Sequence, residues 1–197
     1  SQYVSDAQGM VSLGNSETSK IASKELETGL SEMFGKTISL QSKIEGDKNI
    51  IIGAKEGLSS EIQKEIGSFD QINDEGFIIK SISLKGKNQI VITGKKDIGV
   101  LYGVYSFLRL VQTNKSIKNL NIVDAPKTNI RILNHWDNLD RTVERGYAGF
   151  SLWNWQKLPD FIDQRYIDYA RANASIGING TVLTNVNANA LILTPQY

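Results

Sequence analysis

The sequence Asn129-Ile-Arg-Ile-Leu-Asn134, followed directly by His135-Trp-Asp-Asn138, decides how the last third of this chain folds. Its first six residues are typical of a strand that carries the next four at its carboxyl end. Residues 165–176 have the apolar spacing of a helix, and Gly180-Thr-Val-Leu-Thr-Asn-Val186 is typical of a buried strand. A strand, a long loop, a helix and a second strand predict a βα unit with parallel strands. Polar groups would then gather at the strand carboxyl ends, where barrel enzymes place their sites.

The composition of the chain changes near residue 128. Fifteen of the sixteen Lys precede this point, whereas five of the six Arg, all three Trp and the lone His follow it. Asp124-Ala125-Pro126 marks the joint, because Pro disfavours helix in the residue before it. We therefore predict two domains, 1–127 and 128–197.

The first domain is predicted to be α+β, a mixed sheet with packed helices. Lys85-Gly86-Lys87-Asn88 favours a hairpin. Asp97 is expected to cap the helix predicted over 98–111, and Gly99 and Gly103 would let that helix approach the sheet. Residues 1–19 are poor in large apolar residues, and their start is expected to be loosely held. The expected helices span 19–34, 59/60–66 and 98–111, and the expected strands span 37–44, 49–53, 77–84 and 89–93.

Charge and composition exclude several classes of function. The 197 residues carry a net charge of +1, which argues against a nucleic-acid partner. The absence of Cys and the single His exclude thiolate and multi-histidine metal sites, so no metal or cofactor is expected. Residues 98–111, the longest apolar stretch, fall short of the ~20 that span a bilayer. The run 94–99 lacks the Gly-Lys-Ser/Thr ending of a phosphate loop.

Three segments of the second domain closely resemble a known family. They are Arg131-Ile-Leu-Asn-His-Trp-Asp-Asn-Leu-Asp140, Glu144-Arg-Gly-Tyr-Ala-Gly149 and Tyr169-Ala-Arg-Ala-Asn-Ala-Ser-Ile-Gly-Ile-Asn-Gly180. They are similar to the opening of the catalytic barrel in family 67 glycoside hydrolases, the α-glucuronidases of xylan breakdown. The resemblance implies that 128–197 begin a (β/α)8 TIM barrel behind an α/β accessory domain. It also implies an inverting, exo-acting enzyme that removes (4-O-methyl)-glucuronic acid from glucuronoxylan-derived oligosaccharides (aldouronic acids).

An inverting hydrolase needs a general acid and a general base about 6.5–9.5 Å apart. In the family that this chain resembles, both carboxylates lie on later barrel strands, so no catalytic residue is expected here and the fragment alone should be inactive. Asp137, Asp140 and Glu144 are interpreted as loop anchors that pair with Arg141 and Arg145.

The resemblance does supply residues for the sugar pocket. Trp136 and Val186 match family residues that enclose the 4-O-methyl group, and an indole offers a large apolar surface with one N–H donor. Arg145 could pair with the uronate carboxylate through its planar fork, or tie the loop down. His135 is interpreted as a hydrogen-bonded structural residue. Trp153 and Trp155 share one face of an extended segment, which favours either a stacking platform or burial against the first domain. Further substrate-binding candidates are Asn185 and Asp137, with Asn134 and Asn138 behind them.

Two other functions stay open at this stage. The aromatic loop also fits a non-catalytic carbohydrate-binding or interaction module, and the layout fits a hexosaminidase-like glycosidase. No charged and apolar leader opens the chain, so a signal peptide is absent or was removed, and the periplasm or secretion is expected over the cytoplasm. Two unclosed parallel strands should dock on the first domain, remain mobile or pair with another copy as a homo-oligomer.

Overall fold

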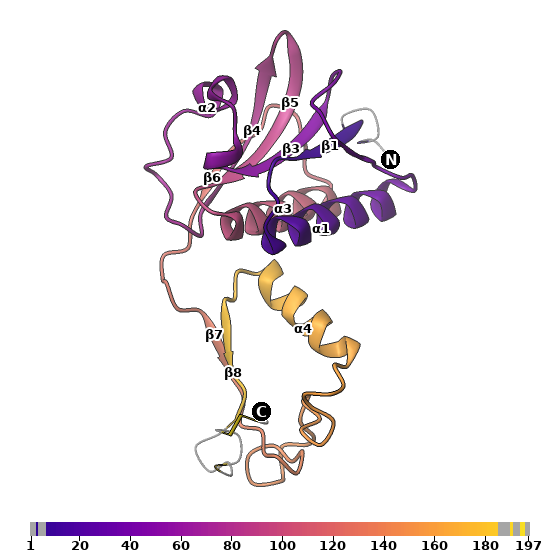
Figure 1. Ribbon diagram of the computed structural model, residues 1–197, viewed down its shortest axis with the longest axis vertical. Coiled ribbons are helices and arrows are strands. Elements are labelled where there is room, and N and C mark those ends of the chain that lie inside the picture. The colour runs from indigo at the N-terminus through magenta and orange to yellow at the C-terminus, as the bar shows by residue number, and fades with distance from the viewer. Residues whose placement is uncertain (1–2, 4–6, 185–189, 191–193, 196–197) are drawn as a thin grey trace. The chain divides into compact units, whose positions relative to one another are not determined.

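Two units make up the chain, Ser1–Lys127 and Thr128–Tyr197. The structure is a computed structural model that describes residues 3, 7–184, 190 and 194–195. Figure 1 shows a sheet with α1 and α3 on one face in the first unit, and a strand pair with one helix in the second. Among the described residues, no helix combines the length and the apolar character needed to cross a membrane.

The sheet of the first unit is mixed. Its strand order is β2-β1-β3-β5-β4-β6, in which the first four are parallel and β4 runs antiparallel to β5 and β6. The strands are β1 Gly9–Ser12, β2 Leu40–Gln41, β3 Asn49–Ala54, β4 Phe77–Leu84, β5 Lys87–Gly94 and β6 Asn121–Asp124. The helices are α1 Glu17–Phe34, the 3-10 turn η1 Lys55–Gly57, α2 Ser60–Ile66 and α3 Asp97–Gln112.

The centre of the sheet is buried on both faces. Ile50 and Ile52 of β3 pack with α1 and α3, whereas Ile51 between them packs with α2. Successive side chains of a strand point to opposite faces, so helices on both sides demand an unbroken apolar run. This is the physical reason for the Ile-Ile-Ile sequence, and the predicted mixed sheet with packed helices is confirmed.

Local signals place most helix ends and the hairpin. Ser16 caps α1 by accepting a bond from the backbone N–H of Ser19 at 3.1 Å, and Gly35 ends the helix with a φ of 67°. Ser59 caps α2 in the same way. The hairpin turn uses Lys85 and Gly86, both at positive φ, although Asn88 was expected to share that role with the glycine.

Three expectations for the first unit are wrong. Asp97 does not cap α3: Lys96 is the cap residue, and the Asp97 carboxylate instead accepts a bond from Ser16 Oγ at 2.6 Å. The strand expected over 37–44 is reduced to β2 at the sheet edge, where it pairs with β1 alone. Residues 9–12 and 121–124 form the unexpected strands β1 and β6, which are stabilised by long-range pairing rather than by a long apolar pattern.

The second unit is built on a parallel pair of strands. β7 (Ile132–Asn134) pairs in parallel with β8 (Gly180–Val182), and α4 (Gln164–Ser175) lies between them in the chain. The predicted parallel pairing is therefore confirmed, with both strands shorter than expected. The side chain of Asn179 bonds the backbones of Asn129 and Arg131, at 2.7 and 2.9 Å, and so fixes the register.

Candidate functional site

The three residues that follow the carboxyl end of β7, His135, Trp136 and Asp137, point alternately to opposite sides of the extended chain. The backbone N–H of His135 extends the strand pairing by donating to the Val182 carbonyl at 2.8 Å. Asp137 is buried, and its carbonyl accepts a bond from Thr184 Oγ1 at 2.6 Å. Trp136 lies between the two and is 44% exposed. The alternation of an extended chain therefore turns the indole away from the side on which Asp137 is anchored.

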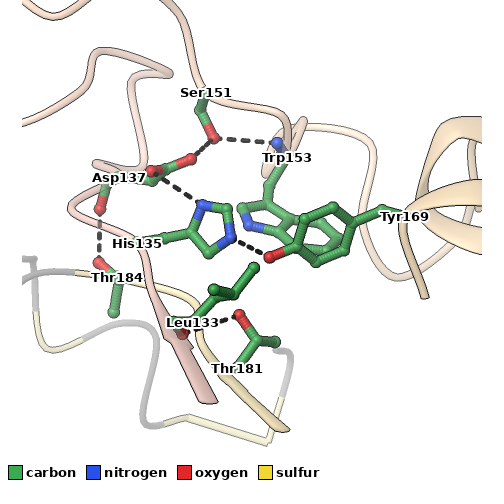
Figure 2. Close-up of polar contacts among 8 residues, drawn as sticks. All are labelled: Leu133, His135, Asp137, Ser151, Trp153, Tyr169, Thr181 and Thr184. Carbon is green, nitrogen blue, oxygen red and sulfur yellow. Dashed lines mark hydrogen bonds and ion pairs between the residues drawn. The ribbon is translucent and has the colours of Figure 1, made fainter. Parts of the chain in front are cut away.

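A line of polar contacts runs from the loop through His135 to α4 (Figure 2). Ser151 Oγ donates to one carboxylate oxygen of Asp137, whose other oxygen lies 3.6 Å from His135 Nδ1. On the far side of the imidazole, Nε2 lies 2.5 Å from the Tyr169 hydroxyl. The carboxylate favours the proton on Nδ1, so that Nε2 accepts the hydroxyl hydrogen. His135 thus has the hydrogen-bonded structural position expected of it.

A cluster of aromatic side chains packs beside His135 and Tyr169. Trp153, Trp155 and Tyr166 are buried together. The Trp153 ring lies 5.9 Å from the ring of His135 and 5.6 Å from that of Tyr169, both edge to face. The two tryptophans form no exposed stacking platform, because both are buried in this cluster within the second unit.

The loop after β7 is anchored by its own backbone and hydroxyl groups rather than by arginine. Asp140 Oδ1 accepts bonds from the Thr142 hydroxyl and N–H at 2.7 and 2.9 Å, which lowers the pKa of that carboxyl. The N–H of Glu144 donates to the Trp136 carbonyl at 2.6 Å. The hydroxyl of Tyr147 donates to Glu144, which raises the pKa of the tyrosine. The expectation of arginine partners is therefore wrong for two of the three acidic residues. Asp137 bonds Ser151, and Asp140 bonds Thr142.

The predicted substrate-binding residues fall into three groups. Trp136 and Arg145 are exposed on the loop side of β7, where a ligand could reach them. Asp137 is only 3% exposed and serves the loop. Asn185 and Val186 lie outside the described residues. Among the second choices, Asn138 braces the loop by donating to Thr142 Oγ1 at 2.9 Å and to the Glu144 carbonyl at 2.7 Å.

Sequence reasoning missed three residues of the polar line. Tyr169 begins one of the quoted segments, but a tyrosine on a helix is ordinarily a core residue, and its bond to His135 spans 34 positions. Ser151 and Thr184 carry no local signal that points toward Asp137. Within the described part of the chain, no cluster of three His, Cys, Asp or Glu is arranged to hold a metal ion.

This arrangement suits positioning rather than acid–base chemistry. The Asp137 carboxylate is buried and bonded to a serine, so it is not presented to a ligand. The backbone on either side of Trp136 is held by the bond from the His135 N–H to the Val182 carbonyl and by the bond from Thr184 Oγ1 to the Asp137 carbonyl. What the site can offer a ligand is an exposed indole on a fixed loop.

Family comparisons cover both units. The model of the glycosyl hydrolase family 67 N-terminus matches residues 1–107, and that of the family 67 middle domain matches residues 110–197. The chain belongs to glycosyl hydrolase family 67. The resemblance seen in the three segments of the second unit is thereby confirmed.

Named relatives of this family 67 chain are similar along nearly all of it. It is 32% identical over 190 residues to a probable alpha-glucuronidase A of Neosartorya fischeri, and 33% identical over 194 residues to that of Aspergillus terreus. Each match covers 95% of this chain and 22% of the relative. The chain thus spans about a fifth of the length of these relatives.

A solved structure has a similar fold. The family GH115 4-O-methyl-alpha-glucuronidase BtGH115A, described as specific for decorated arabinogalactans, superimposes with a TM-score of 0.63 at 15% identity. The match covers 96% of this chain and 27% of that one. At this identity the likeness concerns the fold alone.

Proposed function

We propose that this chain is part of an α-glucuronidase that removes terminal (4-O-methyl)-glucuronic acid from xylooligosaccharides in hemicellulose breakdown. The observation that carries the proposal is the similarity to relatives named alpha-glucuronidase, which extends over 95% of the chain. Aldouronic acids derived from glucuronoxylan would be the substrates.

The second unit, 128–197, would be the start of a (β/α)8 barrel, with 1–127 as an accessory domain. The parallel pair β7 and β8, with α4 between them in the chain, supports this because it is the repeating unit of such a barrel. Trp136 follows the carboxyl end of β7, and barrel enzymes build their sites at that end of the strands.

Within this proposal, Trp136 and Val186 enclose the 4-O-methyl group, and Asn185 and Arg145 contact sugar hydroxyls and the uronate carboxylate. The exposure of Trp136 and Arg145 supports their assignment. Asp137, predicted to contact the sugar, would instead act through Trp136 by holding the backbone beside it.

The reaction would invert the anomeric centre, with an acid and a base about 6.5–9.5 Å apart supplied from outside this chain. The burial and bonding of Asp137, and the contacts of Asp140 with Thr142, support an assignment of these carboxylates to the loop rather than to catalysis. The 197-residue chain alone would then be inactive.

The test is kinetic and uses the full-length parent enzyme. Trp136→Ala should lower kcat/KM on a methylated aldouronic acid by at least about tenfold, the size of one lost apolar contact of 1–3 kcal/mol. Phe161→Ala is the matched control, since Phe161 is an exposed aromatic that lies just before α4, far along the chain from Trp136. Equal kcat/KM for wild type and Trp136→Ala would refute the pocket assignment. The anomer first released, followed by proton NMR, tests inversion directly.

A second assay addresses the chain alone. Purified 197-residue chain, incubated with aldotetraouronic acid, should release no glucuronic acid above a control without protein. Turnover that survives repurification would mean that Asp137, Asp140 or Glu144 is catalytic.

A further inference from the structure

An exposed tyrosine lies on the loop that follows β7. Tyr147 is 71% exposed, more than Trp136 of the same loop region at 44%. Its hydroxyl donates a hydrogen bond to the carboxylate of Glu144, so the far end of the side chain is attached to the loop. Because the polar end of this tyrosine is already bonded, what it offers a ligand is chiefly the apolar face of its ring.

Glu144 is itself held by both polar groups of its backbone. Its N–H donates to the Trp136 carbonyl at 2.6 Å, and its carbonyl accepts a bond from the side-chain amide of Asn138 at 2.7 Å. The residue is half-buried. Hydrogen bonds at the two ends of Glu144 therefore connect the ring of Tyr147 to the residue that carries the exposed indole.

The backbone of this loop adopts uncommon conformations. Four of the nine residues from 141 to 149 have a positive φ, Arg141 at 74°, Glu144 at 57°, Gly146 at 92° and Gly149 at 91°. Arginine and glutamate adopt such angles uncommonly. The loop is closed by bonds from the Gly146 N–H to the Val143 carbonyl at 3.0 Å and from the Val143 N–H to the Gly149 carbonyl at 3.2 Å. Backbone strain of this kind persists only where the surrounding contacts fix it, and it clusters at ligand sites.

The charge of Glu144 determines which part of an acidic oligosaccharide suits the tyrosine. A carboxylate bonded to the Tyr147 hydroxyl repels the carboxylate of a uronic acid, whereas it has no such conflict with a neutral sugar. An ionised carboxylate has about four acceptor positions, so Glu144 can accept further bonds from sugar hydroxyls. Arg145, the next residue and an exposed one, has the charge that a uronate requires.

A xylose residue has the chemistry that fits the tyrosine and its carboxylate. Xylopyranose carries no hydroxymethyl group, so the C–H bonds of its ring face are open to stacking on an aromatic side chain. Its hydroxyls can donate to the remaining acceptor positions of Glu144. A neutral pentose therefore uses both groups, whereas a uronic acid would bring two negative charges together.

We propose that Tyr147 contacts a xylose residue of the substrate and that Glu144 is the positioning residue that orients the tyrosine ring. The choice of xylose rests on the proposed function of the chain. Trp136 and Arg145 then contact the uronic acid, whereas Tyr147 contacts the xylooligosaccharide from which the acid is released. Tyr147 therefore determines the preference for xylose-bearing substrates and is not needed to bind the uronic acid.

The test compares two substrates of the full-length parent enzyme. 4-O-Methyl-α-D-glucuronyl fluoride carries the uronic acid without xylose, and methylated aldotetraouronic acid carries both. Tyr147→Ala should lower kcat/KM on the aldotetraouronic acid about tenfold, the size of one lost apolar contact, and change that on the fluoride by less than about twofold. An equal loss on both substrates, as expected if another part of the parent chain covers Tyr147, would overturn the proposal, and so would no loss on either.

Three more variants separate the ring from the residue that positions it. Tyr147→Phe keeps the ring but loses the bond to Glu144, and should lower kcat/KM on the aldotetraouronic acid about threefold, within the range of one hydrogen bond. Glu144→Ala should lose at least as much. Glu144→Gln keeps an acceptor for the tyrosine hydroxyl and should restore most of the activity that Glu144→Ala loses. Wild-type kcat/KM in Glu144→Ala would overturn the positioning role.

Two control variants calibrate the comparison. Phe161, like Tyr147, is an exposed aromatic residue, and Phe161→Ala should leave the ratio of kcat/KM between the two substrates unchanged. Trp136→Ala should slow both substrates, because both carry the methylated uronic acid that the indole is assigned to enclose. A substrate ratio that changes in Tyr147→Ala and in neither control is the result that supports the xylose contact.

The two proposals fail in different ways. A parent enzyme that cleaves neither substrate would refute the proposed function and, with it, the xylose contact. A parent that cleaves both, with the same substrate ratio in Tyr147→Ala as in wild type, would refute the contact of Tyr147 alone.

Discussion

Gly99 of α3 lies so close to the backbone beside it that a single methyl group should destabilise the first unit. A Cβ added at Gly99 would lie 2.2 Å from the Gly76 carbonyl oxygen, 3.2 Å from its carbon and 3.4 Å from the Asp74 carbonyl oxygen. All three are backbone atoms, which cannot rotate out of the way. Gly99→Ala therefore requires the start of α3 to move away from the Gly76 segment.

Two opposing terms set the size of the effect. Overpacking costs about 1–3 kcal/mol, and a contact this short with backbone belongs at the upper end. Replacing Gly by Ala within a helix gains up to about 1 kcal/mol. We expect Gly99→Ala to lower the free energy of unfolding by about 1–2 kcal/mol.

A matched control is available in α1. A Cβ added at Gly29 would lie 2.9 Å from Leu108 Cδ2, the far end of a flexible side chain. Gly29→Ala should therefore change stability by less than about 1 kcal/mol, because the leucine can shift and the helix gains propensity.

The assay must report the first unit alone. All three Trp lie after residue 128, so intrinsic fluorescence would follow the other unit. Urea unfolding followed through the amide resonances of β3 and β5 reports the sheet that α3 covers, and an unchanged m-value shows that the transition is comparable between variants. If Gly99→Ala proves as stable as Gly29→Ala, then α3 does not approach the Gly76 backbone as closely as described.

Three further predictions concern the core, the polar line and pH. Leu101→Ala and Leu108→Ala should each cost about 2–5 kcal/mol in the same urea assay, because both side chains are buried in the main core; unchanged stability in both would exclude α3 from that core. Tyr169→Phe removes the hydroxyl bonded to His135 and should lower the unfolding free energy of the second unit by about 0.5–1.5 kcal/mol, measured by tryptophan fluorescence, whereas a stability equal to wild type would mean that the bond contributes nothing. Asp163 caps α4, and the bond donated by the Arg165 N–H lowers the pKa of its carboxyl below the ordinary 3.8. The stabilisation of α4 by the charged cap is therefore fully present above pH 3.8, and it is lost as the pH falls through the lowered pKa. Asp163→Ser keeps a capping oxygen without the charge, so the acid-dependent shift of the Arg165 amide should disappear; the same pH profile in the variant would contradict this assignment.

Features that depend on neighbours in the sequence were predictable. Gly35 ends α1 and Ser59 caps α2, because a cap needs only a permissive φ or a side-chain oxygen within one turn. The parallel order of β7 and β8 follows from the helix between them, since a parallel pair requires a long crossover. The family itself was recognisable from three short segments, because they are local strings.

Features that depend on distant partners were not predictable. β1 is four residues long and forms because Met10 lies opposite Ile50, forty positions later. Trp153 and Trp155 could equally have been exposed, and the tertiary contacts with Tyr166 decide that they are buried.

The same division applies to the candidate site. The sequence alone determined that an aromatic residue, Trp136, follows a strand of a parallel unit. Only the tertiary structure decided what holds it there, since Ser151, Tyr169 and Thr184 reach Asp137 and His135 across 14 to 47 positions. The alternation along a strand determines to which face of the sheet a side chain points. The residue that contacts it there comes from a distant segment, so only the tertiary fold determines that partner.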